Sequence, residues 1–155
     1  MRPPADTWEK LWRKNNESHP LVNKWKFLGL GICVNDLESA SDYYSQLGYK
    51  RIEEKKVRKE WKITSEEFYV SDVVFELIQA EKDSIYKNSL AQRGDGVAEM
   101  IFQVPDLKTE IDLLEIKGTK MLKVSDDKKT AYIDSCRKGN LLTRLIEKEL
   151  SLIHI

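Results

Sequence analysis

The chain has 155 residues, of which 41% are apolar and 34% are charged, and its 26 basic and 26 acidic side chains give a formal net charge of zero. This length and apolar content suffice for one domain, or for two small modules that share a core, so disorder is not expected. The balanced charge gives no electrostatic reason to expect a nucleic acid or an anionic membrane as partner. Without a bilayer-spanning apolar run or a signal-peptide pattern, the sequence predicts a soluble, cytoplasmic protein.

The residue types that most often carry catalysis or metal binding are scarce. Cys33 lies in an apolar run and Cys136 beside a turn, and the two form neither a metal-ligand spacing nor a disulfide framework. His19 and His154 stand near opposite ends of the chain. A catalytic triad or dyad built on histidine is therefore not expected.

The first expected element is a short amphipathic helix in an N-terminal extension, residues 1–25. Trp8, Leu11 and Trp12 stand there at helical spacing. Such an apolar face predicts packing on the domain or on a second subunit.

The next elements form a module over residues 26–80. A dense apolar run over residues 27–34 predicts a buried strand, after which Asp36 offers a helix N-cap and Gly48 a helix stop. Strands are expected over residues 49–57 and within residues 67–79. The expected inward face of the helix comprises Leu37, Ala40, Tyr44 and Leu47.

A connecting helix over residues 84–93 leads to a second module over about residues 97–149, followed by a tail, residues 150–155. The module again predicts a strand (98–104) and a helix that Asp106 caps and Gly118 ends, with Leu107, Ile111 and Leu114 on its inward face. Further strands are expected near residues 120–124, 130–134 and 141–146.

The two modules repeat one another at a distance of seventy residues. The residues that return are Val34, Asp36, Leu37 and Gly48, as Val104, Asp106, Leu107 and Gly118. Duplicated units of this size rarely bury their apolar faces alone, so we expect their sheets to pair around a shared concave surface. Such a surface is where a binding or catalytic site is expected.

Several motifs in the middle of the chain are more specific than this pattern. They are Phe75-Glu76-Leu77-Ile78, Ser84-Ile85-Tyr86-Lys87, Arg93-Gly94-Asp95-Gly96 and Met100-Ile101-Phe102-Gln103-Val104-Pro105-Asp106-Leu107. With them, residues 26–149 resemble the vicinal oxygen chelate superfamily, which includes glyoxalases, bleomycin-resistance proteins, extradiol dioxygenases and, as the closest similarity, methylmalonyl-CoA epimerases. The resemblance implies an α+β fold in which two βαβββ modules form a cup. Related folds often dimerise, so a homodimer is expected by analogy.

The resemblance also implies four positions that carry the ligands of a divalent metal in many members. In this sequence they are occupied by Gly29, Glu76, Glu99 and Arg144, or by Thr143 if the match slips by one residue. Glycine has no side chain to donate, and arginine is a permanent cation without a lone pair for a metal. We therefore expect no metal cofactor but an ion-pair cluster of Arg144 with Glu76 and Glu99. The alternative is a divalent metal held by the two glutamates.

Three functions remain open, and with them whether the protein is an enzyme. The first is metal-independent binding of a small organic ligand, such as an acyl thioester, by Arg144, in a cup that Gly29 enlarges and that Glu60 and Tyr69 help to line. The second is an epimerase-like isomerase, or a lyase, in which Glu76 or Glu99 removes a proton next to a carbonyl. The third is a non-catalytic interaction protein, in which the cluster only fills space and contributes specificity of folding.

Overall fold

The computed structural model describes residues 7, 10–11, 25–52, 54–87, 95–133 and 141–147. Trp8, Trp12 and nearly all of the expected N-terminal helix lie outside this set, as do the turn at residues 138–140 and the tail. Of the expected connecting helix, residues 84–87 are described, and 85–87 are helical.

Both modules have the predicted order of strand, helix and further strands. The first comprises β1 (Lys26–Cys33), α2 (Leu37–Gln46), β2 (Lys50–Arg51), β3 (Lys56–Arg58), β4 (Ile63–Val70) and β5 (Val73–Ala80). The second comprises β6 (Gly96–Val104), α4 (Leu107–Ile116), β7 (Met121–Val124), β8 (Thr130–Ile133) and β9 (Leu142–Glu147). The α+β class expected from the sequence is confirmed.

Three local predictions for the first module are wrong. The strand expected over residues 49–57 is split into β2 and β3, which both pair with β4, because the charged residues between them offer no apolar alternation to bury. Strand β4 begins at Ile63, ahead of residue 67, and Ile63 and Ser65 are buried there. Leu47 is 57% exposed, because helix α2 ends at Gln46, before that face is completed.

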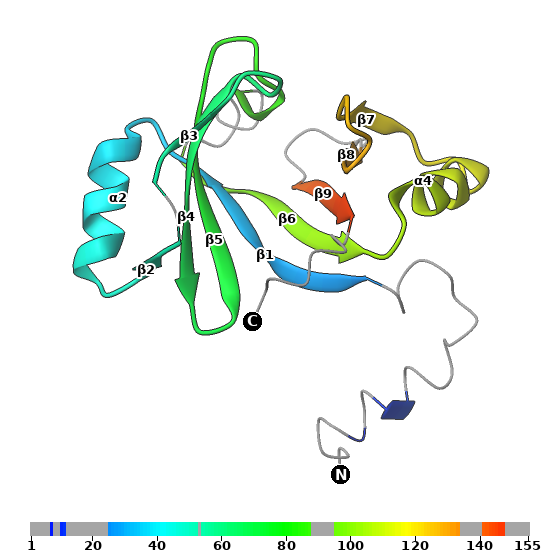
Figure 1. Cartoon of the computed structure of the whole chain (residues 1–155), viewed down its shortest axis with the longest axis horizontal. Helices are drawn as coiled ribbons and strands as arrows, with labels where there is room; N and C mark the ends of the chain where they lie inside the picture. The colour runs from blue at the N-terminus through cyan, green and yellow to red at the C-terminus, as the bar shows by residue number, and fades with distance from the viewer. Residues whose placement is uncertain are drawn as a thin grey trace.

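The nine strands form one sheet in the order β2-β4-β5-β1-β6-β9-β8-β7, with β3 added beside β4. The modules join at the centre through the antiparallel pair β1 and β6, while β1–β5 and β6–β9 are parallel. In Figure 1 the two arms of this sheet bend toward the same side, with α2 outside β4 and β5 and α4 outside β9. The arrangement brings the middle parts of β5, β1, β6 and β9 side by side.

The N-terminus of each helix is held by the last strand of its own module. The side-chain Oε1 of Gln79, in β5, accepts a hydrogen bond of 2.8 Å from Leu37 N. Oε1 of Glu147, in β9, accepts one of 3.1 Å from Leu107 N. The internal repeat thus extends to the contact that orients each helix.

The two aspartates predicted as N-caps behave differently. Asp36 Oδ1 accepts a hydrogen bond of 3.2 Å from Ser39 N, which confirms the predicted cap of α2. Asp106 makes no such bond to the backbone of α4 and instead accepts one of 2.9 Å from the Thr109 hydroxyl.

Separate apolar cores lie under the two helices, and a third is shared by the modules on the inner face of the sheet. The shared core contains Cys33, Trp61, Ile63, Ile78, Tyr86, Ala98, Tyr132 and Leu142. It fills the end of the concave face where β1 finishes and β6 begins. Among the described helices, none is both long enough and apolar enough to cross a membrane.

Candidate functional site

The register of the central strands brings the predicted glutamates together. Gly31 in β1 pairs with Glu76 in β5 on one side and with Glu99 in β6 on the other. Arg144 in β9 pairs with Ile101, two residues after Glu99 and therefore on the same face of β6. Four strands from both modules thus direct two carboxylates and one guanidinium toward one point of the inner face.

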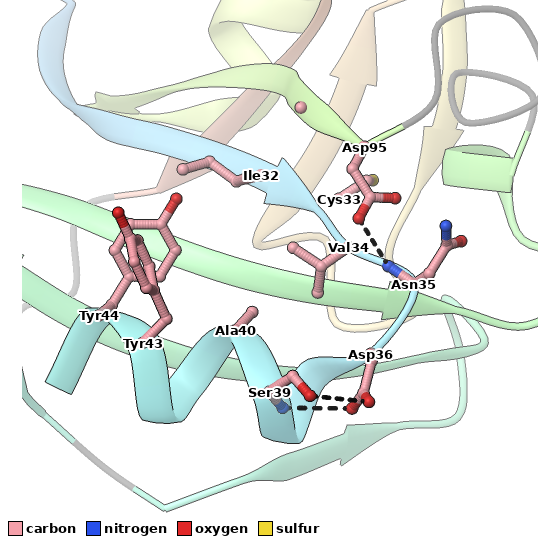
Figure 2. Close-up of a pocket in the computed structure, with 11 residues that line it drawn as sticks. Ile32, Cys33, Val34, Asn35, Asp36, Ser39, Ala40, Tyr43, Tyr44 and Asp95 are labelled. Atoms are coloured by element: carbon pink, nitrogen blue, oxygen red, sulfur yellow. Dashed lines mark hydrogen bonds between the residues drawn. The ribbon is translucent and has the colours of Figure 1, made fainter. Parts of the chain in front are cut away.

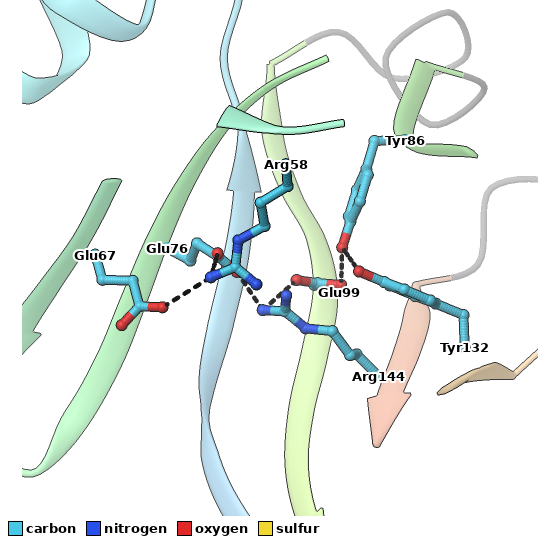
Figure 3. A network of polar contacts seen from close by, with 7 residues as sticks. All are labelled: Arg58, Glu67, Glu76, Tyr86, Glu99, Tyr132 and Arg144. Atoms are coloured by element: carbon cyan, nitrogen blue, oxygen red, sulfur yellow. Dashed lines mark hydrogen bonds and ion pairs between the residues drawn. The ribbon is translucent and has the colours of Figure 1, made fainter. Parts of the chain in front are cut away.

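These three side chains form the ion-pair cluster expected from the sequence. Arg144 Nη2 donates to Glu76 Oε2 and lies 2.9 Å from Glu99 Oε1 (Figure 3). Arg144 is 2% exposed, Glu76 1% and Glu99 0%. Thr143 precedes Arg144 in β9 and so belongs to the opposite face. Of the two residues that the sequence left open, Arg144 is therefore the one that faces the cluster.

A second arginine extends the cluster toward its more exposed side. Arg58 Nη2, from β3, lies 3.3 Å from Glu67 Oε1 and 3.3 Å from Glu76 Oε1. The side chains of Arg58 and Glu67 are each 30% exposed. Sequence reasoning missed both residues, although Glu67 lies directly opposite Glu76 if residues 67–79 are folded as a hairpin.

Two buried tyrosines close the other side of the cluster. Tyr86 OH donates a hydrogen bond of 2.7 Å to Glu99 Oε2, and its oxygen lies 2.5 Å from Tyr132 OH. Burial raises the pKa of both phenols, and the nearby Glu99 carboxylate adds to this effect, so both stay protonated and able to donate. The sequence signal for Tyr86 is its place in the Ser84-Ile85-Tyr86-Lys87 motif; we find none for Tyr132.

The two glutamates of the cluster have pKa values displaced in opposite directions. Burial raises the pKa of Glu99 to about 7, because desolvation of the carboxylate and repulsion from Glu76 together outweigh the attraction of Arg144. Burial alone would also raise the pKa of Glu76, but the Arg144 and Arg58 guanidinia hold it below its ordinary value. At neutral pH the cluster therefore contains one firmly ionised carboxylate and one that exchanges its proton.

This difference predicts that stability falls as the pH rises toward neutrality. The pKa of Glu99 rises from 4.5 to about 7 on folding, so the folded state binds a proton that the unfolded chain has lost, and the stabilising effect is complete below pH 4.5 and lost by about pH 7. At roughly 1.4 kcal/mol per unit of pKa, the change is on the order of 3 kcal/mol. Urea denaturation at stepped pH measures it. Glu99→Gln should flatten the slope in this window, and an unchanged slope would contradict the assignment to Glu99.

Of the two further residues predicted to line the site, Glu60 lies away from the cluster and Tyr69 lies at its border. Glu60 Oε1 accepts a hydrogen bond of 2.7 Å from Asp126 N, and its backbone oxygen accepts one of 2.7 Å from Lys123 Nζ, so Glu60 joins the modules instead of facing the cluster. Tyr69 is on the same face of β4 as Glu67, two residues further along, and is 43% exposed. It therefore stands at the more exposed border of the cluster.

The glycines of β1 do not enlarge the concave face as expected for Gly29. A Cβ at Gly29 would lie 1.8 Å from the backbone oxygen of Val74, and one at Gly31 would lie 2.4 Å from the Glu99 carboxylate. Backbone of β5 thus fills the space beside Gly29, and Gly31 makes room for Glu99. The pairing of β1 with β6 has register shifts between Phe27 and Gly29 and between Gly31 and Ile32, which the sequence does not reveal.

The residues present do not fit the divalent metal that the resemblance implies. Glu76 and Glu99 both face the Arg144 guanidinium, so a dication between them would lie against a permanent positive charge. Within the described parts of the chain, no group of three or more His, Cys, Asp or Glu residues is placed to hold a metal. The absence of a metal cofactor stays a prediction, which the metal content of the purified protein tests.

Three cavities lined by described residues lie outside the cluster. One, of about 490 Å³, is on the outer face, between the start of α2 and the end of β1 (Figure 2). Its lining includes Asp36, Tyr43, Tyr44 and Asp95. One of about 250 Å³ lies beside Ile111 and Val124, and one of about 460 Å³ beside Gly118.

Solved structures similar to this chain share its fold at low sequence identity. Methylmalonyl-CoA epimerase from Mycobacterium tuberculosis is 22% identical, with a TM-score of 0.69 over 83% of this chain and 90% of that one. A variant of the Streptomyces coelicolor methylmalonyl-CoA epimerase, in complex with 2-nitronate-propionyl-CoA, is 19% identical, with a TM-score of 0.68 over 81% and 95%. A hypothetical protein from Bacillus halodurans C-125 is 16% identical, with a TM-score of 0.69 over 82% and 96%.

A comparison with curated protein sequences gives no significant match. Residues 30–136, well over half of the chain, match the family model described as Glyoxalase/Bleomycin resistance protein/Dioxygenase superfamily. This match agrees with the duplicated module and with the pairing of β1 and β6 at the centre of the sheet. The chain therefore belongs to the glyoxalase/bleomycin resistance protein/dioxygenase superfamily.

Proposed function

We propose that the protein binds a small organic ligand, of the carboxylic acid or acyl thioester class, at the cluster on its concave face and without a metal. The observation that carries this proposal is the incomplete hydrogen bonding of the cluster. Among the described residues, Arg144 Nε, Glu76 Oε1 and Glu99 Oε1 are buried and have no hydrogen-bond partner, although each glutamate oxygen lies near a guanidinium nitrogen. The unpartnered Arg144 Nε costs about 1–3 kcal/mol, and a ligand with an acceptor atom would reduce that cost.

The direction of entry follows from the exposure of the surrounding side chains. Trp61, Tyr86 and Tyr132 pack over one side of the cluster and are buried. On the other side Arg58 and Glu67 are half-buried and Tyr69 is exposed. A ligand would therefore approach along β4 and displace the Glu67 side chain from Arg58, whose ion pairs of 3.3 Å are the longer ones of the cluster.

Thermal unfolding in the presence of acyl thioesters tests this function. Methylmalonyl-CoA or propionyl-CoA should stabilise the full-length protein selectively, by about 2.7 kcal/mol at a concentration one hundred times the dissociation constant, and free coenzyme A serves as the control. Elemental analysis of the same preparation should find no stoichiometric divalent metal. No stabilisation by any member of the panel would instead favour a non-catalytic interaction protein, and stoichiometric metal would contradict the metal-independent site.

The pKa of Glu99 favours a second candidate function, an isomerase of the epimerase type. A carboxylate with a pKa of about 7 is well matched to remove a proton next to a thioester carbonyl at neutral pH. Arg144 would then stabilise the negative charge that develops on the carbonyl oxygen. Glu76, whose pKa is held low, would remain the counter-ion of Arg144.

Proton exchange at the alpha carbon distinguishes this isomerase from a pure binding protein. In deuterium oxide, the wild-type protein should introduce deuterium at the alpha carbon of methylmalonyl-CoA, and Glu99→Gln should reduce the rate by at least about 100-fold, the lower end of the usual contribution of a general base. Glu66→Gln is the matched carboxylate control, because Glu66 pairs with Arg51 on the opposite face of β4, away from the cluster. An equal rate in Glu99→Gln would exclude Glu99 as the base.

A further inference from the structure

The two arginines of the cluster are held very differently. Arg144 is 2% exposed and one of its nitrogens bridges two fully buried carboxylates. Arg58 is 30% exposed, and its Nη2 lies at the longer distance of 3.3 Å from both Glu67 and Glu76. Arg144 is therefore committed to the protein's own carboxylates, while Arg58 makes weaker contacts that a ligand can replace.

One edge of the Arg58 guanidinium also has unused hydrogen-bonding capacity. Its Nε is buried and, among the described residues, has no hydrogen-bond partner. Nε–H and the adjacent Nη–H of arginine point in parallel and match the two oxygens of a carboxylate. A carboxylate that replaced Glu67 would thus satisfy a donor that Glu67, bonded only to Nη2, leaves unpaired.

The charges of the network favour a singly charged anion. Glu67, Glu76 and Glu99 carry three carboxylates against the two guanidinia of Arg58 and Arg144. Burial and the repulsion from Glu76 raise the pKa of Glu67, and Glu67 is the most exposed of the three carboxylates. Since the site already contains more acids than bases, a dianion such as phosphate would meet more repulsion than a monocarboxylate would.

We propose that Arg58 anchors a carboxylate of the ligand, which takes the place of the Glu67 side chain on the guanidinium. The ligand class is accordingly a small organic acid, or an acyl thioester that carries a free carboxylate. This inference rests on the proposed ligand-binding function and identifies the group through which the ligand is held. Arg58 is then the residue that determines ligand specificity, whereas the sequence indicated Arg144.

Titration of ¹⁵N-labelled full-length protein with propionate tests the anchor. The Arg58 Nε–H resonance, assigned by its disappearance in Arg58→Lys, should shift saturably with propionate and should not shift with sodium chloride at the same ionic strength. Inorganic phosphate should bind at least about tenfold more weakly than propionate. The matched control is Arg51→Lys, because Arg51 makes a comparable ion pair of 3.4 Å with Glu66 on the opposite face of β4.

Two variants separate anchoring from a structural role. Arg58→Gln should weaken propionate binding about tenfold or more, whereas Glu67→Gln should strengthen it several-fold because the competing carboxylate is gone. A merely structural Arg58–Glu67 pair predicts the same direction of change for both variants. Propionate binding that is unaffected by Arg58→Gln would overturn the anchor but leave ligand binding intact, and failure of both propionate and the acyl thioesters to bind would overturn the proposed function together with the anchor.

Discussion

Arg144→Met is expected to destabilise the protein by about 3–5 kcal/mol, the usual cost of removing one partner from a buried ion pair. The substitution leaves Glu76 and Glu99 in a site that is 1% and 0% exposed, without the cation that both contact. Urea denaturation at pH 7 measures the loss. Lowering the pH should recover part of it, because protonation removes the two unpaired charges.

Lys62→Met is the control for this effect. Its ion pair with Asp83 joins side chains that are 50% and 74% exposed, so the expected loss is about 1 kcal/mol or less. An equal loss in the two variants would show that the buried cluster contributes no more than a surface pair.

Replacing the whole cluster separates a binding role from a structural one. A variant with Arg144→Met, Glu76→Leu and Glu99→Leu should regain most of the stability lost in Arg144→Met, because buried ion pairs are often no better than apolar packing. The same variant should lose stabilisation by acyl thioesters. If it keeps that stabilisation, the ligand does not bind at the cluster.

Gly29→Ala is expected to cost at least about 3 kcal/mol, at the upper end of what overpacking usually causes. The added Cβ would stand 1.8 Å from the oxygen, 2.7 Å from the carbon and 2.9 Å from the nitrogen of Val74, all backbone atoms of β5. Strands β1 and β5 would have to separate, which breaks the ladder that holds Glu76 beside Gly31. Chemical denaturation and the yield of soluble protein measure the effect.

Gly118→Ala provides the comparison for backbone strain without a close contact. Gly118 has a φ of +88° and nothing near a built Cβ, so alanine there should cost only about 1–2 kcal/mol for the left-handed backbone. Gly29→His should be at least as harmful as Gly29→Ala, so a histidine at this position would not recreate a metal site on the present backbone. Wild-type stability of Gly29→Ala would contradict the close approach of the two strands.

The duplicated module was predictable because its signals are local or periodic. Asp36 and Gly48 mark the ends of one helix, and the offset of seventy residues carries the same pattern to Asp106 and Gly118. The resemblance to the superfamily then assigns Glu76 and Glu99 to one site. These features do not depend on how the modules pack.

The residues that complete the cluster could not be found in this way. Arg58 reaches Glu76 only because β3 returns along β4, and Tyr132 reaches Tyr86 only across the joined modules. The different roles of Gly29 and Gly31 depend on two irregularities in the pairing of β1 with β6. Each of these depends on long-range register, which no single stretch of sequence specifies.

The hydrogen bonds between Gln79 and Leu37 and between Glu147 and Leu107 link the inside of the sheet to its outside. Gln79 follows Glu76 by three residues in β5, and Glu147 follows Arg144 by three in β9. A ligand that pulls either charged side chain would shift its strand and thereby the first turn of the helix behind it. The amide resonances of Leu37 and Leu107 would then act as paired remote sensors of occupancy, one for each half of the duplicated fold.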